Sequence, residues 1–139
     1  MRIIYLFIFF LSLNLFGQDL EQHLWNNRIL ILKVDRKNSE ILKDQLDILA
    51  HQNDELKERK LIIYKVTEDE YSKNFNENWI PKNDNFIEDK NQSKTFEVIL
   101  VGLDGGIKFR QDTIISNKKL FSIIDGMSMR IREINSNKN

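Results

Sequence analysis

Residues 28–34, with the sequence RILILKV, are almost continuously apolar. Apolar side chains on both faces are typical of a strand buried in a parallel sheet, whereas a half-exposed strand alternates apolar and polar residues. A polar turn at residues 35–38 ends this stretch. We therefore predict that residues 28–34 form a buried strand of an α/β domain.

The hydrophobic period changes after this strand. Apolar residues recur every three or four positions over residues 39–57, which predicts one amphipathic helix. A second buried strand, LIIYKV, is predicted at residues 61–66. Two strands joined by a helix pair in parallel through a right-handed crossover. The apolar stripe of the helix consists of Leu42, Leu46, Leu49 and Leu56.

A second helix is predicted over residues 71–79. The preceding tetrapeptide TEDE, residues 67–70, matches a capping box. Tyr71, Phe75 and Trp79 then recur every four residues and would form an aromatic face, and Pro81 would end the helix. Residues 82–93 are mostly polar and predict a solvated loop.

The C-terminal third predicts a hairpin followed by a helix. A strand at residues 95–103, a DGG turn at 104–106 and a short strand at 107–110 form the hairpin. Ser116 or Asn117 is expected to cap the last helix, and Gly126 suits a left-handed C-terminal position. This helix is expected to bury Leu120, Ile123 and Ile124.

The predicted order of elements is β-α-β-α-β-β-α, with the first three strands parallel and the fourth antiparallel. This is the order of a thioredoxin-like α/β fold, with a central mixed sheet of about four strands. A fold of this kind does not by itself specify a function.

Residues 1–17 predict a signal peptide. One basic residue, Arg2, precedes an apolar run that is short for a membrane span, and Gly17 is the expected cleavage position. Residues 18–139 would then form a single domain with a frayed tail at 135–139, exported to the periplasm or secreted. The alternative is an uncleaved N-terminus that anchors the protein in a membrane.

Composition excludes several classes of function. The 139 residues include no cysteine, so thiol oxidoreductase and peroxidase activity and cysteine-built zinc sites are excluded. The 21 basic and 21 acidic residues balance, which argues against nucleic acid as a partner. His23 and His51 lack a His or Cys at ligand spacing, so we expect neither a metal nor a cofactor.

A distinctive set of residues runs through the C-terminal part and continues more diffusely upstream. Its members are Asp104, Gly105, Gly106, Lys108, Ser116, Leu120, Phe121, Ile124, Asp125, Met127, Met129, Arg130 and Glu133, with Trp25, Arg28, Gln45, Leu49, Glu58 and Arg59 before them. This pattern resembles the bacterial family known as domain of unknown function 4174. The family is similar to a domain of secreted animal matrix proteins and is regarded as a peroxiredoxin-related, thioredoxin-like fold. The resemblance implies that fold and no established reaction, substrate or cofactor.

The chain departs from the family pattern at two positions. The family usually has Met-Pro-Met-Arg-Arg where this chain has Ser128 in place of the proline and Ile131 in place of the second arginine. Loss of the proline is expected to soften a local kink. Arg132 lies one residue after the position of the second arginine.

The candidate binding residues are Asp125, Arg130, Glu133, Trp25 and Arg28. Asp125 and Arg130 are expected to form a structural ion pair at the end of the last helix. The alternative is that Arg130 presents its guanidinium to an anionic ligand or partner. Trp25 and Arg28 would form a cation–π or edge contact at the margin of the sheet.

The position of a thioredoxin-type cysteine, after the first strand, is occupied by Asn38 and Ser39. We expect either residue to cap the following helix. The protein is therefore expected to be a non-redox binding or scaffolding module. Its partner would be an unknown protein or a small anionic ligand, and the oligomeric state is left open. The alternative is a thiol-independent enzyme that uses Ser39 or the Asp125/Arg130/Glu133 group.

Overall fold

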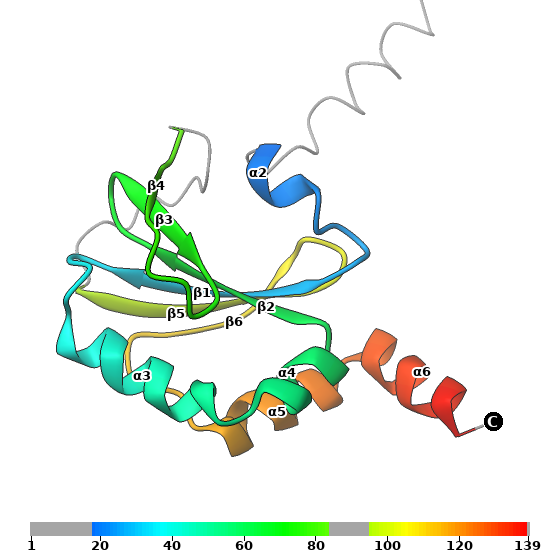
Figure 1. The fold of residues 1–139 in the computed structure, drawn as a ribbon. Helices are drawn as coiled ribbons and strands as arrows, with labels where there is room; N and C mark the ends of the chain where they lie inside the picture. The colour runs from blue at the N-terminus through cyan, green and yellow to red at the C-terminus, as the bar shows by residue number, and fades with distance from the viewer. Residues whose placement is uncertain (1–17, 84–94, 139) are drawn as a thin grey trace, which may run out of the picture.

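The computed structural model describes residues 18–83 and 95–138 (Figure 1). The predicted signal peptide at 1–17 and most of the predicted loop at 82–93 lie outside these residues. The elements are α2 (Gln18–Glu21), β1 (Arg28–Val34), α3 (Glu40–Ala50), α4 (Asn53–Glu58), β2 (Leu61–Val66), β3 (Glu70–Lys73), β4 (Ile80–Pro81), β5 (Phe96–Val101), β6 (Ile107–Gln111), α5 (Asn117–Asp125) and α6 (Ser128–Asn137).

The domain is a mixed α/β structure built on one six-stranded sheet, with the order β4-β3-β2-β1-β5-β6. The expectation of about four strands is corrected by β3 and β4, which extend the β2 edge. β1 pairs in parallel with β2, as predicted. β5 pairs with β1 antiparallel, whereas the sequence analysis expected a parallel third strand.

The antiparallel pairing has a local cause in the segment after β2. Of the residues predicted as a helix at 71–79, the first three belong to β3, which turns back along β2, and the rest form a turn and an irregular segment. The hydroxyl of Thr67 accepts a hydrogen bond from the Glu70 nitrogen at 3.1 Å, and the Thr67 nitrogen donates to the Glu70 oxygen at 2.9 Å. These bonds close a tight turn, so the capping-box pattern marks a hairpin here. Pro81, the last residue of β4, pairs with Glu70, and Phe96, the first residue of β5, pairs with Val34. The chain therefore leaves β4 and enters β5 at the same end of the sheet, which makes β5 antiparallel to β1.

The central strands β1, β2 and β5 are buried on both faces, as the apolar sequence of β1 predicted. Leu30 and Leu32 point to the layer formed by α3, α4 and α5, whereas Ile29 and Ile31 belong to a second cluster that includes Leu20 of α2. Figure 1 shows α3, α4 and α5 on one side of the sheet and α2 on the other. All six residues of β5 are buried in the same way.

The predicted helix over 39–57 is divided. α3 ends at Ala50, His51 caps it, and α4 begins at Asn53. Leu42, Leu49 and Leu56 remain buried, so the apolar stripe continues through the break. His51 is exposed, as its position opposite this stripe predicted.

The C-terminal region contains a second helix, α6, after the predicted one. Ser116 caps α5, as predicted, and its hydroxyl accepts a hydrogen bond from the Lys119 nitrogen. Gly126 has a φ of −81° rather than a left-handed conformation, and the chain continues into α6. The tail expected to fray from residue 135 is therefore helical as far as Asn137. α6 buries a charged residue, Arg130, and so lacks the apolar period that predicts a helix.

Candidate functional site

Three buried arginines meet a group of carboxylates where β1 begins and α4, α5 and α6 converge. Arg28, Arg59 and Arg130 are 0%, 8% and 2% exposed, respectively. A guanidinium is almost never buried without partners, because removing it from water costs several kcal/mol. The acidic partners are Glu55, Glu58, Asp125 and Glu133.

Arg130 directs its donors to groups of the protein itself. Its Nε lies 3.2 Å from Asp125, and its Nη2 lies 2.9 Å from the Glu58 carboxylate. Its Nη1 donates to the Glu58 main-chain oxygen at 3.1 Å and to Glu133 at 3.3 Å. Asp125, Arg130 and Glu133, which the sequence singled out together, are thus in contact. Their geometry supports the structural interpretation, in which Arg130 holds α6 against α4 and α5.

Arg59 is a member of this cluster that sequence reasoning noted only within the family pattern. Its Nε and Nη2 donate to the two oxygens of Asp125 at 3.0 and 2.9 Å, a bidentate fork. Its Nη1 lies 2.7 Å from Glu55. The guanidinium also lies 4.3 Å from the centroid of the Phe121 ring. The four-residue spacing of Glu55 and Arg59 is the one local signal that points to this role.

Arg28 turns toward Glu133 rather than toward Trp25. Its Nη1 donates to the Arg59 main-chain oxygen at 2.9 Å and lies 3.3 Å from both oxygens of Glu133. Trp25 is 63% exposed, and its main-chain nitrogen donates to the main-chain oxygen of Leu103. The structure therefore places Arg28 in the cluster and leaves Trp25 outside it, in contrast to the expected Trp25–Arg28 contact.

The cluster favours the charged forms of Asp125 and Arg130. Burial works to raise the pKa of Asp125, but hydrogen bonds from Arg59 and Arg130 outweigh it and lower that pKa below its ordinary value. Burial likewise opposes the charge of Arg130, yet its bonds to Glu58, Asp125 and Glu133 raise its pKa. These mutually paired charges hold α4, α5 and α6 together and do not provide a free acid or base.

Ser128, where the family pattern has proline, is the first residue of α6. A proline at this position loses no helical hydrogen bond, because the first N–H groups of a helix have no partner within it. The expected softening of a kink is therefore corrected: position 128 begins a helix, and a serine adds one free N–H there.

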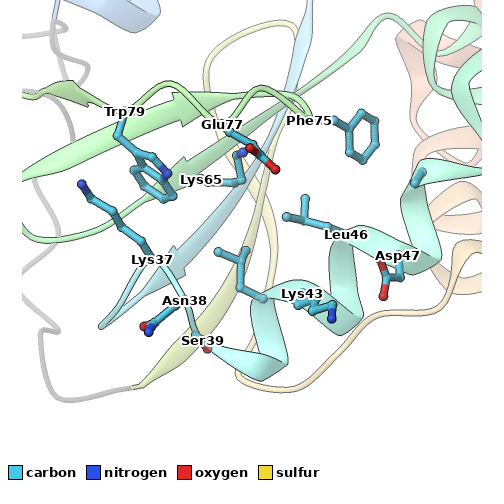
Figure 2. Close-up of a pocket in the computed structure, with 12 residues that line it drawn as sticks. Lys37, Asn38, Ser39, Lys43, Leu46, Asp47, Lys65, Phe75, Glu77 and Trp79 are labelled. Carbon is cyan, nitrogen blue, oxygen red and sulfur yellow. The ribbon is translucent and has the colours of Figure 1, made fainter.

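A separate cleft of about 520 Å³ lies between the start of α3 and the segment that follows β3. Figure 2 shows side chains from α3, β2 and the segment after β3 around this space. Its apolar lining is Leu42, Leu46, Ala50, Phe75 and Trp79, and its polar lining is Lys37, Asn38, Ser39, Lys43, Asp47, Lys65 and Glu77.

Lys65 and Trp79 form one wall of the cleft. Burial lowers the pKa of Lys65, although the nearby charge of Glu77 acts in the opposite direction. The Nζ atoms of Lys65 and Lys37 lie 5.6 and 5.5 Å from the centroid of the Trp79 ring. The ring is therefore within cation–π range of two ammonium groups. Sequence reasoning missed this wall because it assigned Trp79 to a helix.

Ser39 occupies the N-cap position of α3, as expected, but its side chain makes no capping hydrogen bond. Its side chain lines the cleft (Figure 2). The two histidines are apart: His23 is buried and hydrogen-bonded to Tyr64, whereas His51 follows α3 on the other side of the sheet. Among residues 18–83 and 95–138, no group of three or more His, Asp or Glu residues is arranged to hold a metal ion.

Comparison with known proteins identifies the family. The family model described as Domain of unknown function (DUF4174) matches residues 19–133. The chain belongs to the DUF4174 family. This confirms the resemblance drawn from the C-terminal residues. No curated protein and no solved structure matches the chain significantly. In the described part of this DUF4174 protein, no helix is long and apolar enough to cross a membrane.

We expect Arg130→Ala to lower the free energy of unfolding of this DUF4174 protein by about 2–4 kcal/mol, because it removes a buried guanidinium that pairs with three carboxylates. Arg132→Ala, which removes an exposed arginine from the same helix, is the matched control and should change stability by about 0.5 kcal/mol or less. Urea unfolding measures both. Equal stability of the two variants would contradict the structural role of Arg130.

A pH dependence follows from the lowered pKa of Asp125. The carboxylate stabilises the fold above its ordinary pKa of 3.8, and this contribution is lost as pH falls through the lower pKa of the folded state. Asp125→Asn should therefore destabilise the protein most at pH 7 and less at pH 3, where part of this contribution is already lost, in urea unfolding at both values. Asp112→Asn, at an exposed carboxylate, is the control. An Asp125→Asn effect that is equal at both pH values would contradict the ion-pair origin.

Proposed function

We propose that this protein is an exported, non-redox binding module of thioredoxin-like topology. Its ligand would be a small organic molecule with an apolar body and an acidic group, held in the 520 Å³ cleft. The observation that carries the proposal is the composition of this cleft, in which five apolar side chains are combined with three lysines. Pockets of this size with an apolar lining and a few polar groups are the usual sites of small-molecule binding.

The order of strands supports the thioredoxin-like assignment. β1, α3 and β2 form a parallel β-α-β unit, and β5, β6 and α5 form a β-hairpin followed by a helix. The sheet runs β2-β1-β5-β6 through these two units. The cleft lies beside the turn from β1 to α3, the place of the reactive thiol in redox proteins of this fold. Ser39 lines it here, and the chain has no cysteine.

The chemistry of the lining suggests the kind of ligand. Phe75, Leu46 and Trp79 offer an apolar surface to a flat or aliphatic body. Lys37 and Lys43, near the start of α3, offer ammonium groups to an acidic substituent, although Lys37 is also paired with Glu70. The positive end of the α3 dipole adds to this preference for negative charge.

The alternative of a thiol-independent enzyme receives less support. Asp125, Arg130 and Glu133 are paired with one another and with Glu58 and Arg59, and they do not line the cleft. Ser39 does line it, but the cleft holds no histidine to act as its base. If wild type and Ser39→Ala both bind a ligand and release it unchanged, the result supports binding. If wild type converts the ligand and Ser39→Ala does not, the result supports catalysis.

The binding role can be tested with 8-anilinonaphthalene-1-sulfonate, which combines an apolar aromatic body with one negative charge. We expect saturable binding, measured as the increase in fluorescence of the probe. Trp79→Ala should weaken it about tenfold, because the variant removes an aromatic contact and much of the cleft wall. Trp25→Ala removes an exposed tryptophan outside the cleft and should leave the affinity unchanged.

Near-UV circular dichroism of the variants checks that the dye reports a site rather than a loosened fold, because expanded states also bind this dye. Equal affinity of wild type and a folded Trp79→Ala variant would contradict the assignment of the cleft. An equal loss in the folded Trp25→Ala variant would contradict it as well.

Export can be tested by sequencing the N-terminus of the protein from cells that produce the full chain. The short apolar segment with Gly17 at its end predicts a mature protein that begins at Gln18. Recovery from the membrane fraction with Met1 intact would contradict cleavage and favour the anchored alternative.

A further inference from the structure

Lys65 is a charged residue in a row of apolar side chains. Alternate residues of a strand point to the same face, so Lys65 follows Leu61 and Ile63 of β2 towards the helices. The residue is 4% exposed, and it lines the cleft. Figure 2 shows its amine end between Trp79 and Glu77. The side chain is thus withdrawn from bulk water and borders the space that we assign to a ligand.

The amine of Lys65 has a neutral partner rather than an acidic one. Its Nζ donates to the Asn76 main-chain oxygen at 2.5 Å. In the part of the chain that the structure describes, no carboxylate forms a salt bridge with it, and Glu77 contributes a longer-range attraction. Burial therefore prevails and lowers the pKa of Lys65. A buried lysine of this kind is a nucleophile in its neutral form, whereas an ammonium group has no lone pair to donate.

The other two lysines of the cleft differ from Lys65 in their surroundings. Lys37 and Lys43 are exposed to water, and Lys37 is paired with Glu70. Water and a neighbouring carboxylate both stabilise an ammonium group. The two exposed lysines therefore attract an acidic substituent as cations, whereas Lys65 is the amine that is available to react.

We propose that Lys65 attacks the carbonyl carbon of an aldehyde held in the cleft and forms a reversible imine with it. This role of Lys65 rests on the proposed function, because the aldehyde must first bind through its apolar body and its acidic group. Leu46, Phe75 and Trp79 would contact the apolar body. The class of ligand narrows accordingly to aldehydes that combine an apolar body with an acidic group.

Imine formation needs no oxidant or reductant. The nitrogen lone pair of Lys65 forms a bond to the carbonyl carbon, and the π electrons of the carbonyl move to its oxygen, which takes up a proton from the nitrogen. The resulting carbinolamine loses this hydroxyl and the second nitrogen hydrogen as water, and a C=N bond forms. Hydrolysis reverses both steps and returns the aldehyde unchanged, in keeping with a binding role.

The probe is 4-formylbenzoate, an aromatic aldehyde with one carboxylate, in the presence of sodium cyanoborohydride, which reduces the imine to a stable amine. The protein is purified from expression of the full chain, and peptide mapping by mass spectrometry measures the label at each lysine. Lys65 should be labelled at least about tenfold faster than Lys118, an exposed lysine outside the cleft, because the bound aldehyde is held beside the amine. In urea the two lysines should react at similar rates.

Lys65→Arg keeps the positive charge but cannot form an imine. The fast phase of labelling, followed by the mass of the intact protein, should therefore disappear in this variant. Lys118→Arg, the same change at an exposed position outside the cleft, should leave the fast phase unchanged. Near-UV circular dichroism checks that both variants are folded, and the comparison of Lys65 with Lys118 within the wild-type chain needs no variant.

Two results would overturn the proposal: equal labelling rates of Lys65 and Lys118 in the folded wild type, or a fast phase that survives in a folded Lys65→Arg variant. The dye 8-anilinonaphthalene-1-sulfonate has no carbonyl group, so it tests the cleft independently. Dye binding that depends on Trp79, without fast labelling of Lys65, overturns imine formation and leaves the cleft as a binding site. Absence of both dye binding and fast labelling overturns both proposals.

Discussion

The burial of β1 on both faces and along both edges is the constraint on which the rest of the structure depends. Its backbone pairs with β2 on one side and β5 on the other, and its side chains alternate between two apolar layers. In this position the main-chain groups of β1 must all be hydrogen-bonded to other strands and both its faces must be covered. The positions of the two neighbouring strands and of the two apolar layers therefore depend on β1. The ion-pair cluster and the cleft lie at its two ends. Arg28, its first residue, belongs to the cluster, and the turn after Val34 leads into the cleft.

Charge, rather than apolar contact, attaches the last helix to this frame. α6 buries Arg130, whose bonds reach α4 and α5. Its Glu133, which is partly exposed, pairs with Arg28 at the start of β1. Burying these charges costs desolvation free energy. In return the cluster fixes the orientation of α6, because each planar guanidinium binds carboxylates in only a few geometries. It therefore holds the N-terminus of α6 in a defined place beside the β5–β6 turn.

Periodicity predicted the buried strands, because burial on two faces leaves a strong signal in residues 28–34, 61–66 and 95–103. It failed at residues 71–79, where aromatic residues at helical spacing belong to β3 and the segment after it. The side chain of Thr67 fits a helix cap and a tight turn equally well, and pairing with β2 decides between them. α6 went unpredicted because a helix attached by ion pairs carries no apolar stripe.

The sequence by itself determined the central strands, the hairpin turn at Asp104 and the cap of α5, because each depends on the residues at one place in the chain. It also grouped Asp125, Arg130 and Glu133, which are close along one segment. Only the tertiary structure decided that β5 runs antiparallel, that Arg59 completes the cluster and that Trp79 meets Lys65 in a cleft. Those outcomes depend on residues far apart in the chain, whose approach is set by the packing of the whole sheet and not by any local pattern.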